Sequence, residues 1–276
     1  MDDPQFPPPL PDSRSNAEVR QEKSWLKKLL TPFAFIGVLL LKFKGLLIPV
    51  LKFFPVLLKS GGTMFLTIGV YSMMWGWKFA AGFVLLIFIH ECGHLLIARY
   101  WGLKVGAPVF IPFMGALIAL KEAPRNAWIE AQVGIGGPML GTLGAALCFA
   151  IYMVTGSKLF AALAYIGFFL NLFNLAPIGF LDGGRIATAI SPWLWVIGAL
   201  AIALMLFASP MNIILWFVLL SSLPRLMSLF RKRIEEESRY FEVAPGQRWL
   251  MAALYFGLIV FLVAGMLLAE TAAQMH

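Results

Sequence analysis

The chain has 276 residues, of which 60% are hydrophobic and only 13% are charged. Soluble domains carry roughly 25% charged residues, so this composition excludes an ordinary soluble domain and indicates an integral membrane protein. Lys and Arg exceed Asp and Glu by 22 to 14, but the basic residues punctuate apolar runs rather than forming a patch with aromatic side chains, which argues against nucleic-acid binding.

The N-terminal part of the chain carries two different patterns. Residues 1–24 are rich in proline and polar residues and show no signal-peptide cleavage site, so we expect a disordered cytoplasmic tail. In residues 25–60, apolar runs alternate with lysines and are shorter than the roughly 20 residues that a spanning helix needs. This pattern predicts basic amphipathic helices on the membrane surface, with a re-entrant hairpin as the alternative.

Seven later stretches are apolar enough to be candidates for membrane spans. They are residues 62–77, 79–100, 129–153, 158–176, 190–208, 211–226 and 249–269. With the N-terminus inside the cell, only Lys78 and Lys158 fall in the outer connections, as the positive-inside rule requires. Residues 231–248 then form a charged cytoplasmic loop, and residues 249–276 the last span with its tail. We expect an all-α integral membrane protein with about seven transmembrane helices.

Two of the three histidines stand four residues apart inside the span 79–100, in the sequence His90-Glu91-Cys92-Gly93-His94. Side chains at this spacing lie on one face of a helix, so both imidazoles can bind one metal ion. Glu91 is turned by about 100° from His90, which leaves its carboxylate beside the metal and free to take a proton from water. Because ionisable groups inside a membrane span are costly, the pattern indicates a functional, hydrolytic metal site.

A catalytic zinc ion needs a third protein ligand and an open position for water. The remaining histidine is His276 at the C-terminus, so the third ligand has to be a carboxylate or a thiolate. Asp182 is the candidate, because it follows the span 158–176, which returns to the inner side of the membrane. His94 lies on that side too, about 7–8 Å from the boundary as measured along a helix.

Other assignments of these residues stay open. Asp182 and Gly183 could simply form a turn that caps the next helix. Another carboxylate, Glu122 or Glu130, could be the third ligand instead. Cys92 is turned by about 200° from both histidines, so we interpret it as a packing residue.

Prolines and glycines predict where the helical pattern breaks. Pro108, Pro112 and Gly115 interrupt the apolar run 105–120, where β-branched residues favour extended segments. We therefore expect a small strand-like insert next to the site, because irregular backbone at membrane depth is tolerated only against protein or a wet cavity. Pro224 is expected to close the span 211–226 early.

Three motifs occur in order along the chain. They are His90-Glu91-x-x-His94, Gly134-x-Gly136-Gly137-Pro138 and Asn174-x-x-Pro177-x-x-x-x-Asp182-Gly183. Together they resemble the motifs of the site-2 protease family of intramembrane zinc metalloproteases, peptidase family M50. The resemblance covers roughly residues 62–200, and we place the intramembrane protease domain at residues 61–230.

The resemblance implies a role for each motif residue. His90, His94 and Asp182 would bind one zinc ion per chain, and Glu91 would be the general base. Asn174 would hold the substrate backbone or the tetrahedral intermediate, although it could equally be a residue that ends its helix before a proline.

The expected function is that of a zinc-dependent intramembrane endopeptidase acting in regulated intramembrane proteolysis. Its expected partners are the lipid bilayer and a single-span membrane protein substrate, and its expected location is a prokaryotic plasma membrane, with the N-terminus in the cytoplasm. The alternative is a catalytically inactive zinc-binding membrane protein of the same fold. Glu91 favours the enzyme, because a purely structural zinc site has no use for that carboxylate.

Overall fold

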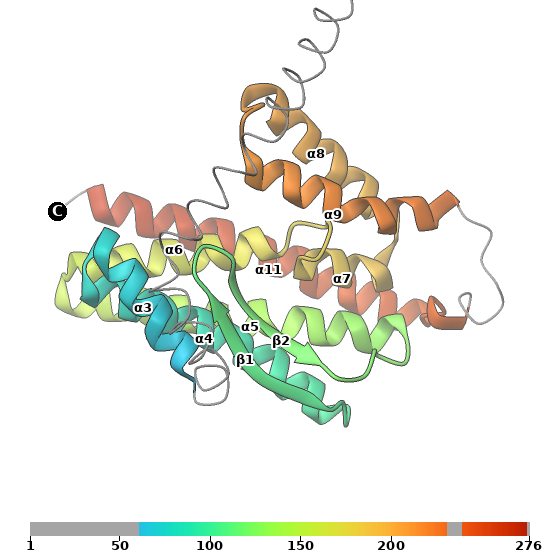
Figure 1. The fold of residues 1–276 in the computed structure, drawn as a ribbon, viewed down its shortest axis with the longest axis horizontal. Helices are drawn as coiled ribbons and strands as arrows, with labels where there is room; N and C mark the ends of the chain where they lie inside the picture. Colours follow the sequence, from blue (N-terminus) through green and yellow to red (C-terminus); the bar gives the residue numbers. More distant parts are fainter. Residues whose placement is uncertain (1–60, 231–238, 275–276) are drawn as a thin grey trace, which may run out of the picture. The chain divides into compact units, whose positions relative to one another are not determined.

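Residues 61–230 and 239–274 are described by the computed structural model of the chain (Figure 1). The predicted segments 1–24 and 25–60, and residues 231–238 of the predicted charged loop, lie outside these described residues. The elements follow in the order α3 (Gly62–Trp75), α4 (Trp77–Tyr100), β1 (Val105–Ile111), β2 (Gly115–Leu120), α5 (Ala127–Thr155), α6 (Lys158–Asn174), α7 (Asp182–Ile190), α8 (Leu194–Ala208), α9 (Ile213–Phe230) and α11 (Pro245–Gln274).

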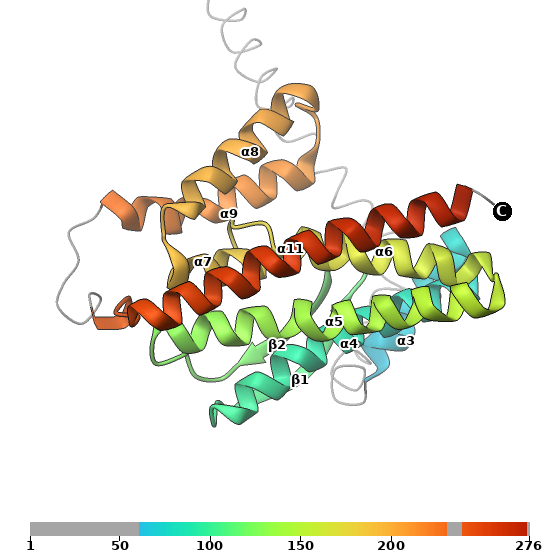
Figure 2. The same cartoon turned by 180° about the vertical axis from the view of Figure 1, so that it is seen from behind.

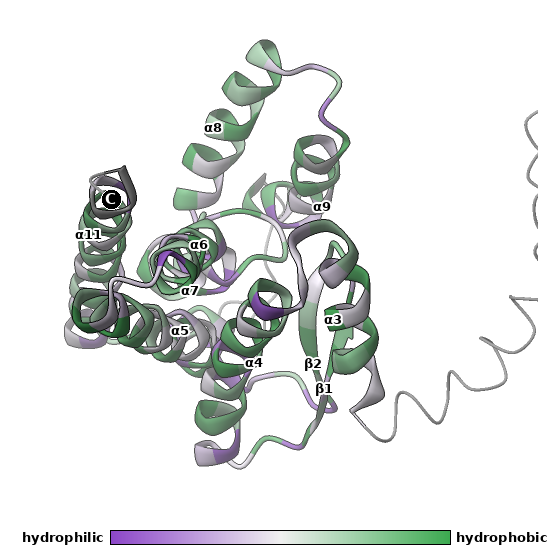
Figure 3. Ribbon diagram, turned by 90° about the vertical axis from the view of Figure 1, so that its left-hand side faces the viewer, coloured by the Kyte–Doolittle hydropathy of each residue, from purple (hydrophilic) through white to green (hydrophobic). Residues whose placement is uncertain are grey.

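Helices α4, α5, α6 and α11 pack side by side, as the view along their axes in Figure 3 shows. Their colouring is mostly hydrophobic on outward as well as inward faces. Ala145 and Ala164 allow α5 and α6 to approach each other, and Phe168 and Leu262 fill the space between α6 and α11. A helix that is apolar all round is either buried in a core or surrounded by lipid. The exposed apolar faces therefore support a membrane location.

Among the described residues, three helices are long and apolar enough to cross a membrane. They are α4, α5 and residues 245–271 of α11. Three further apolar helices, at 158–174, 194–208 and 215–229, are shorter. The membrane assignment and the mostly helical fold are thus supported, whereas the count of seven spans stays a prediction.

Several helix boundaries differ from those predicted, and α11 already begins at Pro245, inside the predicted loop 231–248. Two of the differences have a clear physical cause. The predicted span 190–208 is divided, because Ser191, which precedes Pro192, adopts an extended backbone (φ −164°, ψ 121°) and separates α7 from α8. The prediction that Pro224 closes its span early is wrong, because α9 continues through Pro224 to Phe230. Arg225 forms tertiary hydrogen bonds to α5 and α7, and these contacts stabilise the helix beyond the proline.

The predicted strand-like insert is confirmed as an antiparallel hairpin of β1 and β2, paired from Val105 with Leu120 to Ile111 with Gly115. Its turn contains Phe113 with a positive φ of 66°, a conformation that is uncommon for a residue with a side chain. The backbone N–H of Phe113 donates to the Tyr71 hydroxyl, which fixes the turn against α3. The hairpin also packs along α4, the helix that carries both motif histidines.

Helices α4 and α5 touch backbone to backbone near the motif. A Cβ atom built at Gly93 would lie 2.1 Å from the carbonyl oxygen of Gly136. Side chains on either helix at this point would therefore push the two helices apart. Both glycines stand inside the motifs that the sequence singles out, so the motifs carry packing information as well as chemistry.

Replacing Gly93 by alanine is expected to lower stability, because the new methyl group would overlap a backbone atom that cannot rotate away. The cost of such overpacking is about 1–3 kcal/mol. Gly257→Ala is the matched control, because nothing lies within 4 Å of a Cβ at that position in α11. Thermal unfolding in detergent should show a lower midpoint for Gly93→Ala only. Equal midpoints for the two variants would contradict the close contact.

Candidate metal centre

Helix α4 presents His90 and His94 on one face, one turn apart. Their rings meet edge to face, with centroids 4.8 Å apart, and their Nε2 atoms are 3.1 Å apart. Both side chains are buried. The i, i+4 spacing therefore brings two imidazole nitrogens to one point, as expected for a helical ligand pair.

Asp182, the first residue of α7, reaches the same point from a distant part of the chain. Its Oδ2 atom is 3.1 Å from Nε2 of His90 and 3.2 Å from Nε2 of His94. Asp182 can approach so closely because the next residue is Gly183, where a Cβ would lie 2.0 Å from the carbonyl oxygen of Leu175. Asp182 and Gly183 are the first two residues of α7 and do not form a capping turn before it, since Leu181 is the N-cap. The Asp182 carboxylate faces both rings.

The second nitrogen of each ring is held by an oxygen atom. Nδ1 of His90 is 2.8 Å from Oδ1 of Asn171, and Nδ1 of His94 is 2.7 Å from the carbonyl oxygen of Val133. The Asn171 amide is oriented by its own Nδ2 group, which donates to the carbonyl of Gly167. Because these oxygens accept hydrogen bonds, the Nδ1 atoms carry the protons, and the lone pairs of both Nε2 atoms face the shared point.

A divalent metal ion fits this arrangement. Zinc binds nitrogen and oxygen atoms at about 2.0–2.2 Å in tetrahedral geometry, so two of its ligand atoms lie about 3.4 Å apart. The three atoms of His90, His94 and Asp182 lie 3.1–3.2 Å from one another. Two lone pairs and a carboxylate oxygen would repel at these distances, and a cation among them removes the repulsion. Three protein ligands leave one position open, as in catalytic zinc sites.

Glu91 lies beside the three atoms and is itself buried. The ligand-capable atoms of His90, Glu91 and His94 lie within 4.8 Å of one another. The glutamate is therefore placed next to the metal position.

The other carboxylates considered for the third ligand have different partners. Glu122 is exposed and pairs with Lys104 at 2.9 Å, and the hydrogen bond from Lys104 holds the pKa of the Glu122 carboxyl below its usual value. Glu130 accepts hydrogen bonds from Arg225 and Tyr240. Asn174 is half-buried, and its amide donates to the carbonyl of Leu170 in its own helix. A substrate-holding role for Asn174 stays a prediction.

Sequence reasoning missed Asn171, although it is a buried amide in an otherwise apolar helix and such residues are usually functional. Two glycines of α5 make room for Asn171 and for the ring of His94. A Cβ at Gly137 would lie 2.2 Å from Nε2 of His94, and one at Gly141 would lie 2.2 Å from Oδ1 of Asn171. Gly137, in the α5 motif, therefore leaves space for the His94 ring, and Gly141, one turn later, leaves space for the residue that holds the His90 ring.

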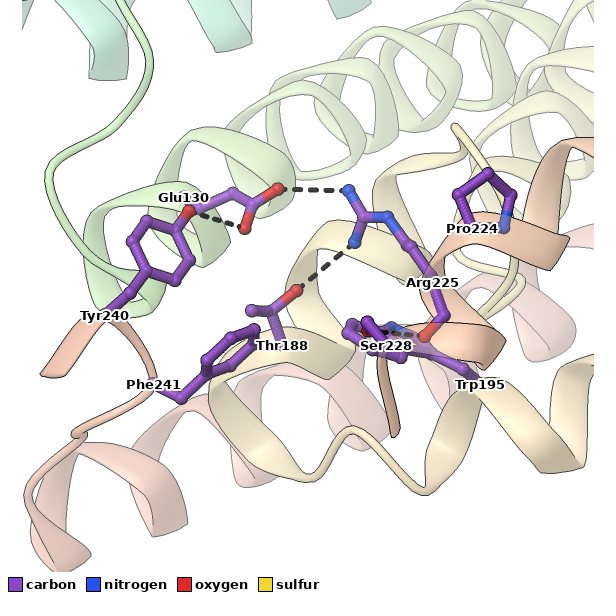
Figure 4. A pocket seen from close by; sticks show the side chains of 8 residues that line it. All are labelled: Glu130, Thr188, Trp195, Pro224, Arg225, Ser228, Tyr240 and Phe241. Carbon is purple, nitrogen blue, oxygen red and sulfur yellow. Dashed lines mark hydrogen bonds and ion pairs between the residues drawn. The ribbon is translucent and has the colours of Figure 1, made fainter. Parts of the chain in front are cut away.

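Sequence reasoning also missed the polar cluster shown in Figure 4, which lines a cavity of about 260 Å³. Arg225 donates to Glu130 at 3.1 Å, to Thr188 at 3.2 Å and to the carbonyl of Gly184 at 2.6 Å. Tyr240 donates to Glu130, and burial, with the Glu130 carboxylate nearby, raises the pKa of the Tyr240 phenol. The cluster joins α5, α7 and α9. Through Arg225 it bonds the carbonyl of Gly184, two residues after Asp182.

Comparison with known proteins gives consistent results. The sequence model of peptidase family M50 matches residues 78–159 and 154–198. A zinc metalloprotease of Methanocaldococcus jannaschii is 31% identical over 124 residues, which cover 43% of this chain and 35% of that protein. A probable chloroplastic zinc metalloprotease of Oryza sativa subsp. indica is 27% identical over 231 residues, covering 64% of this chain and 41% of that protein. The chain thus spans less than half the length of these curated relatives.

A solved structure, the site-2 protease from Methanocaldococcus jannaschii, is also similar. It is 26% identical in sequence, and the match covers 66% of this chain and 87% of that chain with a TM-score of 0.39.

Removal of the Asp182 carboxylate is expected to abolish metal binding. Asp182→Ala leaves two histidines, which cannot complete a three-ligand site, so purified protein should contain little zinc by elemental analysis. Glu122→Ala is the control, since this carboxylate is exposed and paired with Lys104. Zinc retained at the wild-type level by Asp182→Ala would exclude this residue as a ligand.

Two asparagines one turn apart should behave differently. Asn171→Ala frees the ring of His90 and is expected to weaken zinc binding about 10- to 100-fold, the usual effect of losing a hydrogen bond to a ligand. Asn174→Ala should leave zinc affinity unchanged, because its amide donates to Leu170 of its own helix and, among the described residues, bonds no ligand of the site. Competition with a chelator measures both affinities, and the same affinity for the two variants would refute the assignment of Asn171.

Proposed function

The chain belongs to peptidase family M50, and from this membership and the geometry of the centre we propose that it is a zinc-dependent intramembrane endopeptidase. It would hydrolyse peptide bonds in or near the transmembrane segments of membrane proteins. The observation that carries the proposal is the approach of Asp182 Oδ2 to within 3.2 Å of both histidine Nε2 atoms, with Glu91 beside them.

One zinc ion per chain would be held by His90, His94 and Asp182. When bound, zinc supplies Lewis-acid chemistry, since it makes water more acidic and polarises a carbonyl group. Asn171 and the carbonyl of Val133 fix the ring tautomers that such binding requires.

Glu91 is the residue that distinguishes an enzyme from an inactive zinc-binding relative. As general base, its carboxylate would accept a proton from the attacking water and pass that proton to the leaving amine of the substrate. The side chain of Asn174 would hold the substrate backbone close to these groups.

The substrate class follows from the position of the centre. His90 and His94 lie in α4, a helix that is apolar and long enough to span the bilayer. A peptide bond can reach them only from a segment that itself enters the membrane and locally unwinds, which suits a single-span membrane protein. We propose that the site lies near the cytoplasmic face, because Arg99 stands in the last turn of α4, five residues after His94. A prokaryotic plasma membrane stays the expected location.

Glu91→Gln tests the mechanism directly. The amide keeps the size of the side chain but cannot accept the proton, so cleavage of a co-expressed single-span substrate should fall by at least about 100-fold. Zinc content should remain at the wild-type level, because Glu91 is not one of the three ligands. Immunoblots of the substrate and elemental analysis of the purified variant measure the two quantities. Wild-type cleavage by Glu91→Gln would defeat the proposed chemistry.

A further inference from the structure

The third ligand of the centre depends on a segment with little structure of its own. Residues Leu175–Ile190 comprise a loop and the nine-residue helix α7, whose first turn contains Gly183 and Gly184. Helices this short are marginal by themselves, and glycine weakens them further. The other two ligands lie on α4. Asp182 therefore reaches them only if neighbouring elements hold the segment in place.

Helix α11 holds the beginning of this segment. The hydroxyl of Tyr255, a residue that is 2% exposed, donates to the carbonyl oxygen of Leu175 at 2.6 Å. The same carbonyl packs against Gly183, where a Cβ would lie only 2.0 Å from the oxygen. Gly183 is the residue next to Asp182. The Tyr255 hydroxyl therefore fixes the Leu175 carbonyl, and Gly183, next to Asp182, packs against that carbonyl.

The end of the segment is held by the same helix. Nη1 of Arg248 donates to the carbonyl oxygen of Ile190, the last residue of α7, at 3.0 Å. The last carbonyls of a helix lack partners within it and carry partial negative charge, so a guanidinium group is well suited to this position. Arg248 itself lies in the first turn of α11, where a positive charge is unfavourable unless such a partner exists.

Arg248 and Tyr255 are seven residues apart, which is two turns, so both project from one face of α11. Figure 2 shows α11 running along α6 and past α7, in agreement with its packing contacts. The middle of the segment is held from elsewhere, because Trp195 of α8 and Arg225 of α9 both donate to the carbonyl of Gly184. Only α11 bonds both ends of the segment among the described residues.

From these contacts we infer that α11 holds the segment Leu175–Ile190 in the position that the metal centre requires. Tyr255 and Arg248 are then positioning residues for Asp182. The inference rests on the proposed function in one respect, because it takes Asp182 as a metal ligand. It also assigns a role to a helix outside residues 78–198, the part of the chain that the family model matches. The helix would set the affinity of the site for zinc without touching the metal or the substrate.

The test is a zinc titration of the full chain in detergent against a competing chelator. The variants are Tyr255→Phe, which removes a single oxygen atom, Arg248→Gln, and the two combined. The double variant is expected to bind zinc about tenfold more weakly than the wild type, the low end of the effect of supporting groups around a metal. The matched control is Tyr100→Phe combined with Arg125→Gln, since both of these side chains are exposed. It should bind zinc normally.

Turnover gives a second readout. If α11 acts through Asp182, kcat of the double variant falls at limiting zinc, KM stays constant, and excess zinc restores kcat. Wild-type zinc affinity in the double variant would overturn the inference. A lower unfolding midpoint of the metal-free protein with unchanged zinc affinity would overturn it too, because α11 would then only stabilise the fold. If the double variant loses zinc affinity but the wild-type protein cleaves no substrate, the inference about α11 holds and the proposed function is contradicted.

Discussion

Two carboxylates and two imidazoles are buried together inside an apolar helix bundle, and the rest of the structure is arranged around that constraint. Asp182 and Glu91 are 7% and 6% exposed. Burying a carboxylate costs several kcal/mol unless a compensating charge is close. A bound cation would compensate both carboxylates at once. We therefore expect a metal ion to stabilise this arrangement as well as to supply its chemistry.

The surrounding residues make the convergence possible. Gly137 leaves space for the ring of His94, Gly141 leaves space for Asn171, and Gly183 lets the start of α7 pack against the carbonyl of Leu175. The candidate ligands come from α4 and α7, and their rings or backbone are held by hydrogen bonds with α5, α6, α8, α9 and α11. We therefore expect the metal affinity of the site to depend on residues that do not touch the metal.

Sequence reasoning succeeded where the signal was local or periodic. The convergence of His90 and His94 on one helix face follows from their spacing, and the prolines and glycines of residues 105–120 predicted a strand-like insert, which the structure shows as a hairpin. It missed Asn171, because the contact with His90 joins residues 81 positions apart and depends on which faces of α4 and α6 meet. It also expected a helix end at Pro224, where tertiary bonds of Arg225 outweigh the local effect of proline.

The most direct measurement of the central claim is X-ray absorption at the zinc edge of the purified, zinc-loaded protein. Two imidazole nitrogens and a carboxylate oxygen should give a first shell at about 2.0–2.2 Å. The outer-shell scattering should correspond to two imidazole rings. A sulfur shell at about 2.3 Å, which would place Cys92 or Cys148 on the metal, or the absence of imidazole scattering would contradict the account.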